Sequence, residues 1–173
     1  YFIFDLVIFR KKNRKEIYKF TKLLNKNSRI FVNSFVEKSK KISKYFLKKK
    51  IDLAISLAWH NKLKKNFLNH FSLGVINFHP SPLPLNRGCH SAFWGIYNNT
   101  NHGSTMHFMD KNWDWGAIID KLTFPNRDDY FAEYIFKKSR TCSLMLLQKN
   151  LKKMRDGNFK NLKKFTKKDL KRS

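Results

Sequence analysis

The chain has 173 residues, 42% of them hydrophobic, which is enough for one globular domain with a single core. Its two cysteines, Cys89 and Cys142, exclude a disulfide framework and favour a reducing compartment. The sequence shows no signal peptide and no apolar run near the roughly 18 residues that a membrane helix needs. We therefore expect a soluble, cytoplasmic protein with no membrane partner.

Positive charge is distributed unevenly along the chain, whose formal net charge is +25. The segment from Ile76 to Phe136 holds four basic and six acidic residues, so the positive charge lies in the flanks. Such flanks suit a polyanion such as RNA. The lysines are spread without a single stacking-aromatic motif, however, so biased composition is the simpler interpretation. The low-charge centre, interrupted by glycine and proline, is where loops carrying a site are expected.

Strands and helices alternate in the first half of the sequence. Apolar runs predict strands, and apolar residues at helical spacing predict the helices between them. We expect strands at Tyr1–Phe9, Arg29–Phe35, Ile51–Trp59 and Gly74–Phe78, the last running into His79, and helices at Lys15–Leu24 and Glu37–Lys49. This order predicts an α/β fold: an open, mostly parallel, Rossmann-like twisted sheet with helices on both faces. Ligands of such sheets bind beyond the carboxyl ends of the strands.

The second half begins with a proline-rich loop, Pro80–Gly88, that excludes regular structure. We then expect a short helix at Ala92–Tyr97, strands at Ser104–Met109 and Ala117–Phe124, and a helix from about Tyr130 to Lys152 capped by Asp128 and Asp129. Residues 1–160 are interpreted as one catalytic domain and residues 161–173 as a basic tail.

Three polar residues could support chemistry together. Asn77 and His79 are two apart on one strand, so their side chains point to the same face. Asp114 follows in a loop between two strands. An amide can stabilise an oxyanion, an imidazole can donate or move protons, and a carboxylate can accept a proton from an attacking amine. Such a set could transfer an acyl group without a covalent intermediate.

Simpler interpretations remain open for the same residues. An Asn-x-His beside a proline is also typical of a turn with a hydrogen-bonded histidine. His79, His90 and His107 could form a metal site, although no metal-ligand spacing supports one. Ser81 could be a nucleophile, but the Gly-x-Ser-x-Gly elbow is absent.

Several ordered motifs carry a family resemblance. They read NFHPSPLPLNRG at residues 77–88, GSTMHFMD at 103–110 and DWGAII at 114–119. In this order and spacing they resemble the N10-formyltetrahydrofolate-dependent formyltransferases. The resemblance implies the formyltransferase fold and formyl transfer from 10-formyltetrahydrofolate, used as a co-substrate, to a primary amine, with no metal.

The resemblance also implies residue roles. Asn77, His79 and Asp114 match the catalytic trio. The folate-binding positions match His60, Asn61, Leu63, Met109 and Asp110, and the positions that support the site match His107, Arg87 and Gly88. Two residues depart from the family pattern: Pro82 stands where leucine is usual, and Trp115 where a small residue is common. The family's first strand and turn have no counterpart before Tyr1, so we expect an N-terminally truncated domain.

The acceptor is less well defined. Arg87-Gly88-Cys89-His90, followed by Phe93–Ile96, is most similar to sugar-nucleotide N-formyltransferases, which implies a nucleotide-linked amino sugar as acceptor. A methionyl-tRNA formyltransferase is the alternative, since basic flanks would suit an RNA backbone. Glycinamide ribonucleotide as acceptor, a homodimer, and an inactive remnant or basic RNA-binding module also stay open.

Overall fold

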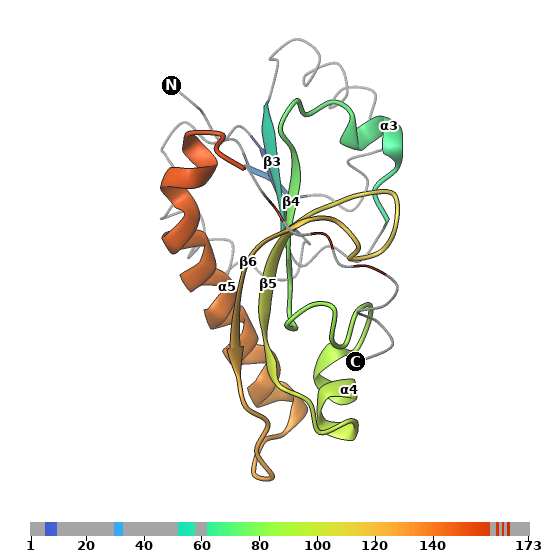
Figure 1. Cartoon of the computed structure of the whole chain (residues 1–173), viewed down its shortest axis with the longest axis vertical. Helices are drawn as coiled ribbons and strands as arrows, with labels where there is room; N and C mark the ends of the chain where they lie inside the picture. Colours follow the sequence, from blue (N-terminus) through green and yellow to red (C-terminus); the bar gives the residue numbers. More distant parts are fainter. Residues whose placement is uncertain are drawn as a thin grey trace.

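The computed structural model describes residues 6–9, 30–32, 52–57 and 62–159, together with 162, 164 and 166. Within these ranges the chain forms one six-stranded sheet flanked by helices (Figure 1). The strands are β1 Leu6–Phe9, β2 Ile30–Val32, β3 Leu53–Leu57, β4 Gly74–His79, β5 His102–Phe108 and β6 Ile118–Phe124. The helices are α3 Lys65–Leu68, α4 Ser91–Tyr97 and α5 Ala132–Arg155.

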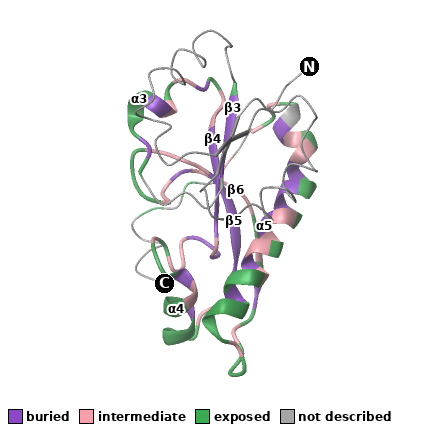
Figure 2. Cartoon of the chain, turned by 180° about the vertical axis from the view of Figure 1, so that it is seen from behind, coloured by how far each residue is buried: buried purple, intermediate pink, exposed green. Residues whose placement is uncertain are grey.

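The strand order is β2-β1-β3-β4-β5-β6. The first four strands in this order run parallel, whereas β5 is antiparallel to β4 and β6 is antiparallel to β5. Helix α5 lies along one side of the sheet, and α3 and α4 lie on the other (Figures 1 and 2). The predicted open, mostly parallel sheet with helices on both faces is therefore confirmed.

The core lies between α5 and the sheet. In β4, Ile76 and Phe78 point to this side, and Met106 of β5 stands directly opposite Phe78. The cluster also includes Leu53, Ile55, Leu146, Leu147 and Met154. Burying a side chain of this size contributes about 1.5–3 kcal/mol, so this layer holds much of the fold's stability. Figure 2 shows β4 and β5 as largely buried and α4 as largely exposed.

The predicted start of the last helix was wrong. Helix α5 begins at Ala132, with Phe131 at the N-cap position and no side-chain cap. Asp129, expected to cap the helix, instead pairs with Arg127 through a 3.2 Å contact between its Oδ1 and the guanidinium Nε. The helix ends at Arg155, three residues beyond the predicted end, because its apolar face continues to Met154 in the core.

Where the flanking residues are described, other boundaries differ by at most two residues. Strand β5 begins at His102, two residues before the predicted start. The one-turn helix α3 was not predicted. The predicted helices at 15–24 and 37–49 lie outside the described residues, as does nearly all of the basic tail. Within the described ranges, no helix is both long enough and apolar enough to cross a membrane.

Candidate active site

Asn77 and His79 project from β4 on the side of the sheet opposite the core. The antiparallel register with β5 places Asn77 opposite His107 and His79 opposite Thr105. Directly opposed residues of an antiparallel pair share a face, so four polar side chains gather here. Asn77, His79 and His107 are only 9%, 4% and 1% exposed. We call Asn77, His79, His107 and Asp114, which joins them from a loop, the polar cluster.

Asp114 reaches the cluster from the loop between β5 and β6. In Figure 1 this loop (yellow) projects on the side away from α5. Asp114 Oδ2 lies 3.4 Å from His79 Nδ1, and its Oδ1 lies 3.6 Å from His107 Nε2. The main-chain N–H of Gly88 also donates to Oδ2, at 3.2 Å. The structure thus brings together the three residues that the sequence singled out, although Asp114 lies 35 positions after His79.

Both ring nitrogens of His79 face oxygens that can only accept a hydrogen bond. Nε2 lies 3.1 Å from the carbonyl oxygen of Asn86, and Nδ1 faces the carboxylate of Asp114. Either ring nitrogen of His79 can therefore donate a hydrogen bond to the oxygen that it faces.

His107 is in a different state. Burial lowers its pKa to about 4, and the nearby Asp114 carboxylate offsets that effect only in part. At neutral pH the ring is therefore uncharged. Nδ1 donates to the carbonyl oxygen of Phe108 at 2.8 Å, which leaves Nε2 to accept from the amide nitrogen of Asn77 at 3.3 Å. The contact with Asp114 is thus not an ion pair, and His107 fixes the orientation of the Asn77 amide.

Thr105 fastens the 80–88 loop to the same face. Its hydroxyl accepts from the main-chain N–H of Leu83 at 2.9 Å and donates to the carbonyl of Ser81 at 2.7 Å. Sequence reasoning missed Thr105, although strand alternation places it on the face of His107. Ser81 Oγ donates to the carbonyl of Leu85 at 2.7 Å, so its proton is directed at main chain. This geometry gives no support to Ser81 as a nucleophile.

Arg87 and Gly88 lie at the end of this loop. Gly88 has φ +92°, a conformation that favours glycine, and it contacts Asp114 through its main chain. The guanidinium of Arg87 lies over the ring of Trp115, with 4.7 Å between Cζ and the ring centroid. Two adjacent residues of one loop therefore meet two adjacent residues of the other.

The residues matched to folate binding are only partly described. His60 and Asn61 lie outside the described residues. Leu63 is buried, with only 1% of the residue exposed. Met109 and Asp110 open the loop that carries Asp114; the Met109 N–H donates to Val75 O at 2.7 Å, and Asp110 accepts from the N–H of Asn112, also at 2.7 Å.

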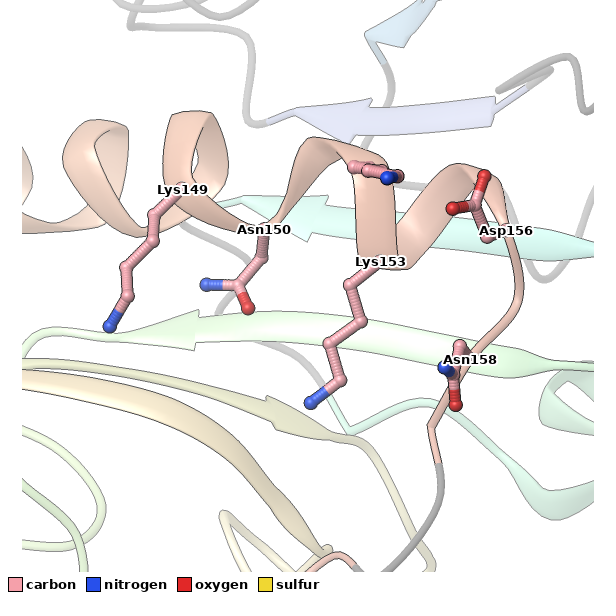
Figure 3. A pocket seen from close by; sticks show the side chains of 6 residues that line it. Lys149, Asn150, Lys153, Asp156 and Asn158 are labelled. Carbon is pink, nitrogen blue, oxygen red and sulfur yellow. The ribbon is translucent and has the colours of Figure 1, made fainter.

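The proposed metal alternative gains no support from the described part of the chain, where no three His, Cys, Asp or Glu side chains are placed to hold an ion. His90, one of its candidate ligands, is exposed at the start of α4. A shallow hollow lies elsewhere, beside the end of α5. Figure 3 shows Lys149, Asn150 and Lys153 pointing from the helix toward the strands there. It contains none of the predicted site residues.

Fold and polar cluster together point to one class of protein. The model of the formyl transferase family matches residues 8–147. The chain belongs to this family, and the resemblance inferred from the motifs is confirmed.

Two relatives of known activity are similar in sequence to part of this chain. A GDP-perosamine N-formyltransferase of Brucella melitensis is 30% identical over 109 residues, which cover 61% of this chain and 41% of the relative. A methionyl-tRNA formyltransferase of Prochlorococcus marinus is 27% identical over 127 residues, covering 73% and 38%. The chain therefore spans about two fifths of the length of these relatives.

A solved structure shares the fold. It is an N-formyltransferase from Helicobacter canadensis in complex with folinic acid and dTDP-3-aminofucose. It aligns with a TM-score of 0.74 at 20% identity, covering 95% of this chain and 69% of that one.

Proposed function

We propose that this protein transfers a formyl group from 10-formyltetrahydrofolate to the primary amine of a nucleotide-linked amino sugar. The polar cluster is the observation that carries the proposal. It places an oriented amide, an imidazole and a carboxylate on one face of β4 and β5, all nearly buried. Buried, pre-oriented groups stabilise developing charge more strongly than the same groups in water.

In the proposed reaction, Asn77 and His79 act on the formyl oxygen. The amine nitrogen bonds to the formyl carbon, negative charge develops on the formyl oxygen, and the bond from that carbon to the folate nitrogen then breaks. One N–H of Asn77 is directed to His107, and the other is the donor for the oxygen. His79 donates from Nε2, which requires that it exchange the carbonyl of Asn86 for the formyl oxygen.

Asp114 is assigned the proton from the amine. The attacking nitrogen gains positive charge and must lose a proton, and the leaving folate nitrogen must gain one. Asp114 Oδ2 faces His79, so a proton taken by the carboxylate lies next to the imidazole that can relay it onward. His107 is uncharged at neutral pH, so it adds no positive charge beside this carboxylate.

Two findings support 10-formyltetrahydrofolate as the co-substrate: the formyl transferase family to which the chain belongs, and the folinic acid bound to the Helicobacter canadensis enzyme. When bound, 10-formyltetrahydrofolate supplies an already activated formyl group. Met109 and Asp110 are proposed as one wall of its pocket, with His60, Asn61 and Leu63 on the other. No metal is needed in this scheme, since the amide and imidazole stabilise the charge.

The sugar acceptor is favoured by the relatives named for GDP-perosamine and dTDP-3-aminofucose. Methionyl-tRNA remains a second candidate, because a methionyl-tRNA formyltransferase covers more of this chain and the net charge is +25.

The test offers 10-formyltetrahydrofolate and one acceptor at a time, and measures release of tetrahydrofolate and formylated product. The acceptors are dTDP-3-aminofucose, GDP-perosamine and methionyl-tRNA. We expect transfer to at least one nucleotide-linked sugar, a rate about 10²- to 10³-fold lower for His79→Ala, and the same rate with and without a chelator. Transfer to tRNA alone would replace the acceptor, and absence of transfer to all three would refute the proposal.

A further inference from the structure

We propose that Arg87, held against Trp115, binds the diphosphate of the acceptor and so places the amine beside Asp114. The inference rests on the proposed function, because it concerns an acceptor of the same site. Its basis is the pairing of two loops at one corner: the Gly88 N–H donates to Asp114 at 3.2 Å, and the adjacent Arg87 stacks on the adjacent Trp115 at 4.7 Å.

Stacking determines which part of the guanidinium stays available. A ring over one face restrains the flat group but leaves its edge N–H donors free. Arg87 is exposed, and no carboxylate among the described residues forms an ion pair with it. A restrained, planar fork of donors matches two oxygens of a phosphate and loses little conformational entropy on binding.

Two other cations of the low-charge central segment already have partners. Arg127 already pairs with Asp129, and Lys121 Nζ donates to the carbonyl of Leu83 at 3.3 Å. The negative charge of Asp114 is itself turned toward His79 and the N–H of Gly88. Arg87 is thus a cation next to the site whose charge is not already used by a carboxylate.

The kinetic test compares dTDP-3-aminofucose with free 3-aminofucose, which carries the same amine without the diphosphate. We expect Arg87→Gln to raise KM for the nucleotide-linked sugar about 10- to 100-fold, as for loss of a charge-assisted pair, with kcat within about threefold. Its kcat/KM for the free sugar should match wild type. Arg87→Lys keeps the positive charge but not the planar pair of donors, so its KM for the nucleotide-linked sugar should lie between those of wild type and Arg87→Gln. The matched control is Arg127→Gln, expected to behave as wild type.

A binding measurement separates this inference from the proposed function. Inorganic pyrophosphate is titrated into the full chain by calorimetry. Wild type and Arg127→Gln should bind it equally, and Arg87→Gln at least about tenfold more weakly. Equal binding by Arg87→Gln and wild type would overturn the inference, as would equal kinetic losses on both sugars, which would mean that Arg87 only positions Asp114. If no acceptor is formylated but pyrophosphate binding depends on Arg87, the proposed function fails and the anion site stands.

Discussion

The two faces of β4 and β5 are built from alternating residues of the same strands and have opposite character. Toward α5 lie Ile76, Phe78 and Met106, packed in the core. Away from α5 lie Asn77, His79 and His107, joined by hydrogen bonds and by Asp114. Residues that follow one another in a strand, about 3.3 Å apart along it, therefore have their side chains in different surroundings.

The apolar face is expected to contribute mainly to stability, and the polar face mainly to the proposed reaction. The apolar face contributes through buried area, which depends on volume and not on any one functional group. On the polar face, burial removes polar groups from water, which costs free energy. Hydrogen bonds between the buried groups offset this cost. Substitutions on the first face should therefore change the free energy of unfolding, and substitutions on the second should change the rate.

The largest effect is expected on the apolar face. Met106→Ala removes a fully buried side chain and leaves a cavity, which typically costs about 2–5 kcal/mol of unfolding free energy. Met145→Ala, at an exposed position of α5, is the matched control and should change stability by less than about 0.5 kcal/mol. Urea unfolding measures both. A rate per folded molecule that also falls by tenfold or more would break the separation of the faces.

On the polar face, Asn77→Ala and His79→Ala should each lower turnover by about 10²- to 10³-fold, the range for loss of one oxyanion donor. Circular dichroism should show an unchanged fold. His70→Ala, on the segment after α3, and Asn98→Ala, after α4, are matched controls away from the cluster. Turnover of either cluster variant within about threefold of wild type would remove that residue from the mechanism.

His107 links the polar face to stability through pH. Its pKa is lowered to about 4 by burial, whereas the unfolded chain takes up this proton near pH 6.5. Between these values the unfolded state binds more protons, so stability falls as pH falls, by roughly 3 kcal/mol from this group. His107→Gln should lose that dependence, measured as unfolding free energy at pH 7.5 and 4.5. An equal pH dependence in wild type and variant would contradict the neutral, buried ring.

Asp114→Asn is expected to have the smallest of these effects, about 10²-fold on turnover with little change in folate affinity. Asn tolerates the φ of +48° at this position, so the backbone should stay in place. An amide cannot take the proton of the amine, so turnover should fall although the site keeps its shape. Asp128→Asn, in an exposed turn, is the control. A large loss of folate affinity with turnover preserved would make Asp114 a pocket residue instead.

Much of this arrangement follows from sequence. The continuous apolar run of β3 and the alternation in β4 predicted a buried sheet and a shared face for Asn77 and His79. The motif resemblance supplied Asp114 and His107, whose distance along the chain no local pattern bridges. The missed cap of α5 shows why local signals fail: Asp129 was expected to cap the helix, but its carboxylate pairs with Arg127 instead.

Other details depend on contacts that sequence patterns do not encode. Strand β5 runs antiparallel to β4, and this direction places His107 opposite Asn77. The hydrophobic pattern of a strand does not determine the direction of its neighbour. The tautomer of His107 follows from the carbonyl of Phe108, and the hydrogen bond of His79 from the backbone of Asn86. Backbone acceptors are the same in every residue, so no side-chain motif marks them.

The separation in sequence between the paired strands has a consequence for folding kinetics. Asn77 and His107 are 30 residues apart, and between them the chain leaves the sheet, forms α4 and returns. Closing such a loop precedes any gain from pairing, so contacts of this kind form slowly. On a ribosome, the amide of Asn77 would emerge well before its partner. The geometry of the polar cluster would therefore arise only once β4 and β5 have paired, and a folate analogue that binds at the proposed site would report completed folding instead of assisting its early steps.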